Sequence, residues 1–392
     1  MNRYNFDEVN DRYNTYSTQW DYTQDRFGAA DVLPFSISDT DFKAPEEIVE
    51  KLTALSKYGI YGYTRWNHED FKDAICYYYQ KRHQVNISDT TIVYSPSVMY
   101  TMAVMIRGLS QENDQIVTLL PMYDAFFKVI EENNRTLSAS PLLYTDSGYL
   151  IDWNDLEQRL QEATIFILCS PHNPTGRVWT QEELAQIIDL CRKYDVWIIS
   201  DEIHSDIVHT SRPHLPIMHP SFVYKKKILI SSASKTFNTP ALIGSYALFY
   251  DKETADILLQ QSRYCDFVNS ASLFGMHALM VGYTQCFDYI EELKEYVYNN
   301  YEYLKKELAR ISSNKIELKE LESTYLVWFD ISNVGVSPEV LQNLLVEKGK
   351  LGIMSGIHYG DTNFMRINIG CPRSKLEEAV RRMKIVFKGL NK

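Results

Sequence analysis

Five short apolar runs of the sequence are each followed by residues that could bind a ligand or take part in catalysis. The groups that follow these runs lie at residues 95–99, 121–123, 170–176, 201–204 and 232–238. They include a phenol (Tyr123), an amide (Asn173), a carboxylate (Asp201), an imidazole (His204) and a lysine (Lys235). Ligands of open α/β sheets bind beyond the carboxyl ends of the strands. We therefore expect these side chains to meet at one edge of a sheet.

One cofactor, pyridoxal phosphate, has a use for every member of this set. A lysine amine forms a Schiff base with the cofactor aldehyde, and we assign this role to Lys235. Asp201 would keep the pyridinium nitrogen protonated, because an adjacent anion favours the charged form. Asn173 would donate to the phenolic oxygen of the ring, with His204 nearby. Tyr123 would stack on the ring face.

The phosphate of this cofactor would bind at the start of a helix. A helical pattern opens after Ser97, and its first residues are Val98 and Met99. Their N–H groups have no partner within the helix, and the helix dipole favours an anion there. Ser232 would add a hydroxyl. The sequence therefore predicts a phosphate site at residues 97–99.

Each of these residues also has a structural interpretation when it is considered alone. Asn173 precedes a proline, a common way to start a turn, and Asp201 could cap the segment that follows it. A single lysine such as Lys235 is most often a solvated surface charge. Tyr123 could be a core ring with a hydrated hydroxyl. The joint placement of these residues after apolar runs favours the cofactor site.

The elements that must position these residues alternate along the chain. Apolar runs rich in Val and Ile predict strands at residues 91–94, 116–120, 165–169, 196–200, 228–231 and 246–250. Runs that are apolar throughout are typical of a mixed, mostly parallel sheet that is buried on both faces. Helical patterns separate these runs, and the clearest begins at Thr180, where Glu183 completes a capping box. The alternation predicts an α/β fold with the sheet between helices.

The pattern changes after about residue 285. A charged helical pattern at residues 289–311 precedes strands at 325–331 and 364–369 and a final helix at 374–387. We expect a large cofactor-binding domain at residues 47–285. A smaller α+β domain would follow at 286–392, completed by an N-terminal segment at residues 1–46.

Composition and charge exclude several classes of protein. The 392 residues include 40 Lys and Arg against 51 Asp and Glu, a net charge of −11. An acidic chain without a basic tail is a poor candidate for nucleic-acid binding. No apolar run approaches the roughly 18–20 residues that span a bilayer, and residues 1–7 lack the apolar core of a signal peptide. The six cysteines form no CxxC pair, which argues against a metal site. We expect a cytoplasmic protein that binds neither membranes nor metals.

Many of these segments together resemble the class I/II aminotransferase superfamily of fold-type I pyridoxal-phosphate enzymes. The segments that carry the resemblance are SDTDF (38–42), YGYTRW (61–66), YSPSVMY (94–100), PMYDAFFK (121–128), CSPHNPTGRVWT (169–180), ISDEIHSDIV (199–208), SASKTFNTPALIGSYAL (232–248), STYLVWFD (323–330) and GCPRSKLE (370–377). Within the superfamily, the chain is similar to the cystathionine β-lyase, or C–S lyase, branch typified by the maltose-regulon modulator. The resemblance covers nearly the whole chain.

The resemblance implies roles for two further residues. Arg366 matches the arginine that binds the substrate α-carboxylate, and a guanidinium can bind a carboxylate through two parallel hydrogen bonds. Tyr63 matches a tyrosine that reaches the cofactor phosphate of the neighbouring subunit, so the resemblance implies a homodimer with shared active sites. Without the resemblance, Arg366 could form a structural ion pair and Tyr63 could be one more aromatic residue.

The chain departs from the patterns of the family at three places. His204 stands where many aminotransferases have a tyrosine, as it does in the lyase branch. Ile243 stands where many have an arginine that pairs with the phosphate. Residues 38–41 read Ser-Asp-Thr-Asp, whereas the lyase branch usually has Ala-Asp-Met-Asp. This segment lies at the substrate rim in relatives, so the substrate itself stays open.

The resemblance implies a C–S lyase that splits cystathionine or a related S-substituted cysteine by β-elimination. The products would be a thiol such as homocysteine, pyruvate and ammonia, with Lys235 as the general base. An aminotransferase of a small L-amino acid is the alternative, because one fold serves both reactions. A second alternative is a regulatory protein that binds a transcription factor. No GxGxxG follows a predicted strand, and HExxH and GxSxG are missing, which disfavours dinucleotide-dependent oxidoreductases, zinc hydrolases and serine esterases.

Overall fold

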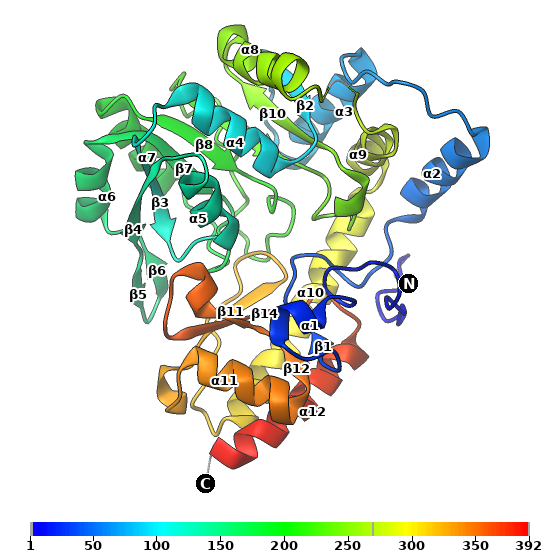
Figure 1. Ribbon diagram of the computed structural model, residues 1–392, viewed down its shortest axis with the longest axis vertical. Helices are drawn as coiled ribbons and strands as arrows, with labels where there is room; N and C mark the ends of the chain where they lie inside the picture. The colour runs from blue at the N-terminus through cyan, green and yellow to red at the C-terminus, as the bar shows by residue number, and fades with distance from the viewer. Residues whose placement is uncertain (1–2, 269, 391–392) are drawn as a thin grey trace.

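A seven-stranded sheet forms the centre of the computed structural model, which describes residues 3–268 and 270–390 (Figure 1). In spatial order its strands are β2 (Thr91–Ser95), β10 (Ser245–Phe249), β9 (Lys227–Ser231), β8 (Trp197–Asp201), β7 (Ala163–Cys169), β3 (Gln115–Leu120) and β4 (Thr136–Pro141). All neighbours are parallel except β10, which is antiparallel to both β2 and β9. The mixed, mostly parallel sheet predicted from the sequence is confirmed.

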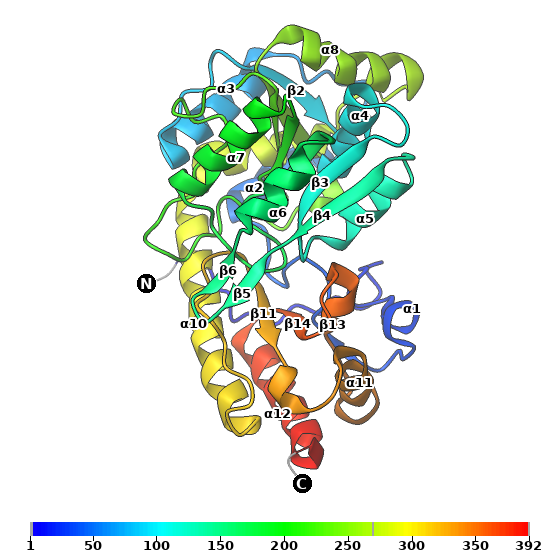
Figure 2. The ribbon, with the colours of Figure 1, turned by 90° about the vertical axis from the view of Figure 1, so that its left-hand side faces the viewer.

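Helices cover both faces of this sheet (Figure 2). One face carries α4 (Val98–Leu109), α5 (Asp124–Glu131) and α8 (Lys252–Gln260); the other carries α3 (Glu69–Tyr78), α6 (Trp153–Leu160) and α7 (Gln181–Lys193). Successive strand residues point to opposite faces, so Ile198 and Ile199 belong to different hydrophobic clusters. Burial on both faces explains why the strand sequences are apolar without alternation.

The predicted strands and the predicted cap are present, and one strand of the large sheet was missed. All six predicted strands occur within two residues of the expected bounds. Thr180 and Glu183 form the expected capping box at the start of α7. Strand β4 was not predicted. It pairs only with β3 at the sheet edge and is largely half-buried, so its sequence Thr-Leu-Ser-Ala-Ser-Pro lacks the continuous apolar pattern.

A smaller antiparallel sheet lies below the large one (Figure 1). Its order is β11 (Leu326–Asp330), β14 (Phe364–Asn368) and β13 (Met354–Ser355), so the predicted strand pair is present. The long helix α10 (Phe287–Ile311) runs from the large sheet down to the small one and contacts α12 (Arg373–Leu390). The short helix α11 (Pro338–Leu344) contacts β13 and lies on the opposite side of the small sheet from α10 (Figure 2).

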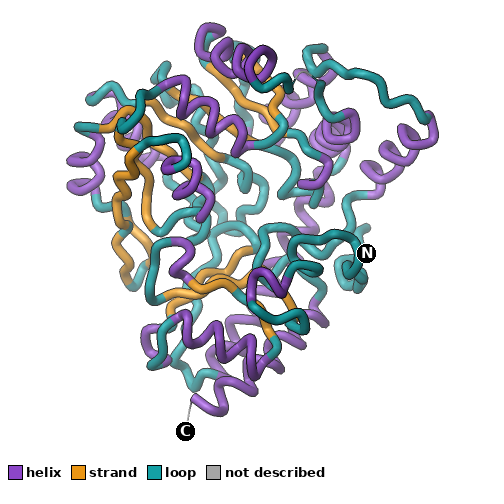
Figure 3. Tube along the Cα trace, viewed as in Figure 1, coloured by secondary structure: helices purple, strands orange, loops and turns teal. Residues whose placement is uncertain are grey.

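The N-terminal segment joins the small sheet to the large one. Strand β1 (Leu33–Pro34) pairs with β12 (Leu351–Gly352), and Phe35 O accepts a hydrogen bond from Asn368 N (3.1 Å). Residues 36–42, which we call the strap, then cross toward the large sheet, where Asn238 Oδ1 accepts from Thr40 N (3.1 Å). Loops fill the region between the two sheets (Figure 3). These contacts support our proposal that residues 1–46 and 286–392 form one domain and residues 47–285 the other.

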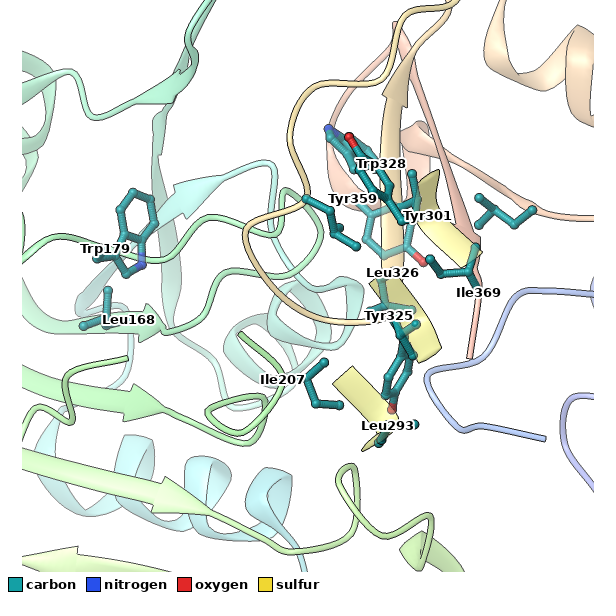
Figure 4. Packing of buried hydrophobic residues seen from close by; sticks show 14 of the residues in the cluster. Leu168, Trp179, Ile207, Leu293, Tyr301, Tyr325, Leu326, Trp328, Tyr359 and Ile369 are labelled. Carbon is teal, nitrogen blue, oxygen red and sulfur yellow. The ribbon is translucent and has the colours of Figure 1, made fainter. Parts of the chain in front are cut away.

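One hydrophobic cluster extends from the large sheet into the small one. It contains Leu168 of β7, Ile207, Leu293 of α10 and the pair Tyr325 and Leu326 (Figure 4). All five side chains are almost completely buried. The loops between the sheets therefore rest on a packed core, which holds the residues they carry in fixed positions.

The described ranges 3–268 and 270–390 contain no helix with the length and apolar character needed to cross a membrane. Within the same ranges, no three His, Cys, Asp or Glu side chains are grouped closely enough to hold a metal ion.

Candidate active site

The ends of the central strands open onto one cavity of about 210 Å³. Eight of the ten predicted site residues line it: Val98, Met99, Tyr123, Asn173, Asp201, His204, Ser232 and Lys235. They follow β2, β3, β7, β8 and β9, so the cavity collects side chains from five separate loops. The sheet thus brings together residues that lie far apart in the sequence.

Asp201 is the last residue of β8 and is buried in the cavity wall. Its Oδ1 accepts one hydrogen bond from Ile203 N (3.2 Å), so part of the capping interpretation holds. Burial raises the pKa of Asp201 to about 7, although the hydrogen bond from Ile203 and the charge of Lys235 act in the opposite direction. A carboxylate in such surroundings is stabilised by a charged N–H partner, which a pyridinium ring would supply.

Lys235 lies in the turn after β9 and is partly buried, so it is not a solvated surface charge. Its Nζ donates to Ser38 O in the strap (2.7 Å). Burial lowers the pKa of Lys235, with Asp39 and Asp201 opposing the shift and Arg366 adding to it. A lowered pKa increases the fraction of neutral amine, which is the nucleophilic form.

Arg366 of β14 lies next to the cavity wall and is buried. It donates from one terminal nitrogen to Asn173 Oδ1 (3.0 Å) and from the other to Ser36 O (2.8 Å). Its guanidinium carbon is 4.4 Å from the ring centroid of Tyr359. None of these three contacts is anionic, so the charge of the guanidinium is available for a carboxylate. The observed contacts do not form the structural ion pair that was the other interpretation.

His204 lines the cavity and has a ring nitrogen without a hydrogen-bond partner among the described residues. This atom, Nδ1, is buried. Burial, with smaller contributions from the charges of Lys235 and Arg366, lowers the pKa of His204 to about 3, so the ring is neutral. Buried polar atoms normally have a partner, and a cofactor oxygen would be a suitable one. Tyr123, whose pKa burial raises to about 12, lines the same cavity as a neutral phenol.

The start of α4 lines the end of the cavity where the sequence predicts the phosphate. Ser97 caps this helix by accepting a hydrogen bond from Tyr100 N (3.0 Å), and Val98 and Met99 are its first two residues. Ser232 donates its hydroxyl to Gly244 O (2.6 Å) and accepts from Ser234 N (3.1 Å). The hydroxyl of Ser232 thus stabilises its own loop, and its proton is donated to Gly244 O and not into the cavity.

Tyr63 does not line the cavity of its own chain. Its side chain is fully exposed, at 101%. The hydroxyl of the next residue, Thr64, donates to Ala271 O, which holds this segment against residue 271. Several other large apolar side chains are exposed. Before Tyr63 these are Tyr58, Ile60 and Tyr61, before Ala271 they are Tyr264 and Phe267, and Ile243 precedes the cavity residue Gly244.

Several lining residues were not predicted as ligands. Ser38 contributes its backbone carbonyl, and a backbone group cannot be recognised from the type of residue. The resemblance had placed its segment at the substrate rim. Ser245 starts β10, and because β10 is antiparallel, its amino end reaches the cavity. A search of carboxyl ends alone therefore misses Ser245. Cys169 ends β7 and accepts a hydrogen bond from Asn173 N at its sulfur (3.4 Å).

Comparison with known proteins agrees with this geometry. A model of the family "Aminotransferase class I and II" matches residues 30–383. MalY of Escherichia coli (strain K12) is 38% identical, covering 96% of this chain and 97% of that protein. The cystathionine beta-lyase PatB of Bacillus subtilis (strain 168) is 34% identical, with 97% and 99% covered. A pyridoxal-phosphate-bound structure from Clostridium difficile 630, described as a proposed aminotransferase, has a TM-score of 0.94 at 35% identity, with 98% and 100% covered.

The match spans the large sheet, the cavity and the small sheet, and includes every segment that supplies a predicted site residue. The chain therefore belongs to the class I and II aminotransferase family of fold-type I pyridoxal-phosphate enzymes.

Proposed function

We propose that this protein is a C–S lyase that splits cystathionine or a related S-substituted cysteine by β-elimination. The observation that carries the proposal is the single cavity that joins Lys235, Asp201 and the lyase-type His204. A relative that is 34% identical over nearly its whole length is named a cystathionine beta-lyase. The products would be a thiol such as homocysteine, pyruvate and ammonia.

Pyridoxal phosphate is the cofactor, and the residues of the cavity fit it. Lys235 would supply the amine and buried Asp201 would partner the ring nitrogen, and both line the cavity. His204 lines the same cavity, and its buried Nδ1 has no hydrogen-bond partner among the described residues. The start of α4 supplies N–H groups and a favourable dipole for the phosphate. When bound, the cofactor supplies a sink for the electrons of the substrate Cα–H bond.

The residues of the chain would divide the remaining work among them. Arg366, fixed by Asn173 and Ser36, would bind and orient the substrate α-carboxylate. Lys235 would take the proton from Cα, and its lowered pKa favours the free-base form that this step needs. Asp201 would hold the proton at the ring nitrogen, since its buried anion is stabilised by that charge.

The test of the reaction type uses purified protein, cystathionine and no 2-oxo acid. An elimination enzyme is regenerated in each cycle, so we expect pyruvate and homocysteine to accumulate over many turnovers. If product stops at one equivalent per subunit and resumes when a 2-oxo acid is added, the main activity is transamination. The same cavity and the same Arg366 would serve an aminotransferase, which is our second candidate.

The test of cofactor attachment uses the same protein without substrate. The purified protein should be yellow, and borohydride should fix the cofactor on the peptide that contains Lys235. Label on another lysine would overturn the site assignment independently of the reaction type.

We also propose a homodimer in which Tyr63 of one chain reaches the cofactor phosphate of the other. Tyr63 is fully exposed, and its sequence neighbours Tyr58, Ile60 and Tyr61 are exposed as well. Exposed large apolar side chains gathered in one segment are typical of interfaces, and two-fold dimers are the commonest closed assembly. Ile243 at the position of the phosphate-binding arginine increases the need for such a hydroxyl.

A further inference from the structure

The carboxylate of Asp206 is buried between two turns that both supply the active site. One turn, residues 201–207, carries Asp201 and His204; the other, residues 233–238, carries Lys235. Asp206 Oδ2 accepts a hydrogen bond from Thr236 Oγ1 at 2.7 Å. Thr236 directly follows Lys235, and both partners are 2% exposed. Among the described residues, this is the hydrogen bond that joins residues 203–207 to residues 233–238.

Asp206 is itself held from a third direction. Its Oδ1 accepts hydrogen bonds from Tyr78 OH (2.8 Å) and from Arg82 Nε (3.2 Å). Tyr78 ends α3, and Arg82 lies in the π-helical turn η1 (Tyr79–His83) that follows it. Arg82 also donates to the carbonyl of Asp206 (2.8 Å) and pairs with Glu291 of α10 (2.5 Å).

The surroundings of Tyr78 make this anchor rigid. Its ring stacks on Tyr283 of α9 (Leu273–Gln285), with centroids 3.8 Å apart and planes 10° from parallel. Buried carboxylates are stable only when their oxygens are hydrogen-bonded, and here both oxygens are. The Asp206 carboxylate is therefore a fixed point to which the turn carrying Lys235 is attached.

We propose that Asp206 is a positioning residue, which holds Thr236 and thereby fixes the turn of Lys235 relative to the turn of Asp201 and His204. The inference rests on the proposed function, because it concerns the alignment of Lys235 with the cofactor. Asp206 and Thr236 do not line the cavity and act only through their neighbours. A supporting group that fixes a reacting group in this way affects catalysis because small displacements of the reacting group are costly.

The test replaces Thr236 in the holoenzyme by valine, which removes the hydroxyl but keeps a side chain of similar shape. We expect kcat for pyruvate release to fall by about 10–100-fold with KM nearly unchanged, the size expected for a displacement of about 1 Å. The visible circular dichroism per bound cofactor should also weaken, because a flat cofactor gains this signal only when it is held in one orientation. Thr236→Ser keeps the hydroxyl and should restore both values.

Two further variants separate positioning from general stability. Asp206→Asn should lower the dichroism, and combining it with Thr236→Val should add little, because both changes break the same bond. Tyr224→Phe removes a hydrogen bond to Val196 O (2.8 Å) that involves neither Asp206 nor a residue lining the cavity, and it should lower the free energy of unfolding without weakening the dichroism. If Thr236→Val keeps the wild-type dichroism and kcat, or if Tyr224→Phe weakens the dichroism equally, the positioning role is wrong. A colourless protein, or label on another lysine, would instead overturn the proposed function.

Discussion

The cavity has one end where we predict the cofactor ring, which we call the ring end, and one where we predict the phosphate, which we call the phosphate end. The two ends differ in how many of the groups that could bind the cofactor come from a single chain. At the ring end, Asp201 is the last residue of β8, Asn173 and His204 lie in the turns after β7 and β8, and all three are buried. Asn173 also fixes the Arg366 guanidinium. At the phosphate end, the wall consists of a helix start and of Ser232, whose hydroxyl donates to the protein. Ile243, where many relatives have an arginine, is half-exposed.

This difference follows from the chemistry of the two ends. Holding a proton at a ring nitrogen requires one carboxylate in a fixed, dry position, which a strand end of a buried sheet provides. A phosphate can be bound by several weak donors, including backbone N–H groups and a hydroxyl from outside the chain. The ring end is therefore built by the fold, and we expect the phosphate end to be completed by a second copy.

The largest effect is expected at the ring end. Asp201→Ala should lower the rate of elimination by about 10³-fold, as when a central electrostatic group is lost. The yellow colour should persist, because Lys235 still attaches the cofactor. The comparison needs kcat for pyruvate release and the visible absorbance of the same preparation. Near-normal turnover would leave Asp201 with only its hydrogen bond to Ile203.

The cost of burying this carboxylate should appear in the cofactor-free protein. The pKa of Asp201 rises from 3.8 to about 7 on folding, so between these pH values the folded chain binds more protons than the unfolded chain. Stability is then lost as pH rises through this window. Asp201→Asn should be more stable than wild type by roughly 2–4 kcal/mol at pH 8, and the difference should vanish near pH 4.

Urea unfolding of both cofactor-free proteins at the two pH values measures this difference. Asp146→Asn, which changes a fully exposed carboxylate, is the matched control and should show no such dependence. An equal gain of the Asp201→Asn variant at both pH values would contradict the buried-acid assignment.

Mixing two impaired variants, Tyr63→Ala and Lys235→Ala, should restore part of the activity if the phosphate end is shared between chains. Tyr63→Ala keeps its lysine and Lys235→Ala keeps its tyrosine, so each homodimer should be impaired. Co-refolded in equal amounts, about half the dimers should be mixed, each with one native site of two, which gives roughly a quarter of wild-type activity. Activity that stays at the mean of the two parents would show that Tyr63 serves its own chain.

The smallest effect is expected at the start of α4. Ser97→Ala removes the hydrogen bond to Tyr100 N and should lower the free energy of unfolding by about 1 kcal/mol. It should also weaken cofactor binding, because the first turn of the helix then frays. Ser337→Ala removes the equivalent cap of α11, away from the cavity, and should change stability without changing cofactor affinity. Equal affinity changes in both variants would contradict a phosphate site at α4.

The sequence predicts the strands around the cavity well, because burial on both faces makes them easy to recognise. Asp201 ends β8 and Lys235 lies in the turn after β9, so their meeting in one cavity could be expected. Strand β4 was not predicted because a half-buried edge strand has no continuous apolar run. Ser38 acts through its backbone, and Ser245 enters from an antiparallel strand. Arg366 and Tyr63 came from resemblance alone, since nothing in their spacing places them near Lys235.

The path of the strap has a consequence for the order in which the protein can be made. Arg366 donates to Ser36 O, a residue 330 positions earlier in the sequence. Strand β1 can pair only after residues 351–352 have been synthesised. A growing chain can form the seven-stranded sheet once it has passed Phe249, the end of β10. Although both are synthesised early, β1 finds its partner β12 and the strap finds Arg366 and Asn368 of β14 only near the end of translation. Contacts so distant in sequence form slowly. The substrate end of the cavity is thus among the last parts of the molecule that synthesis can complete.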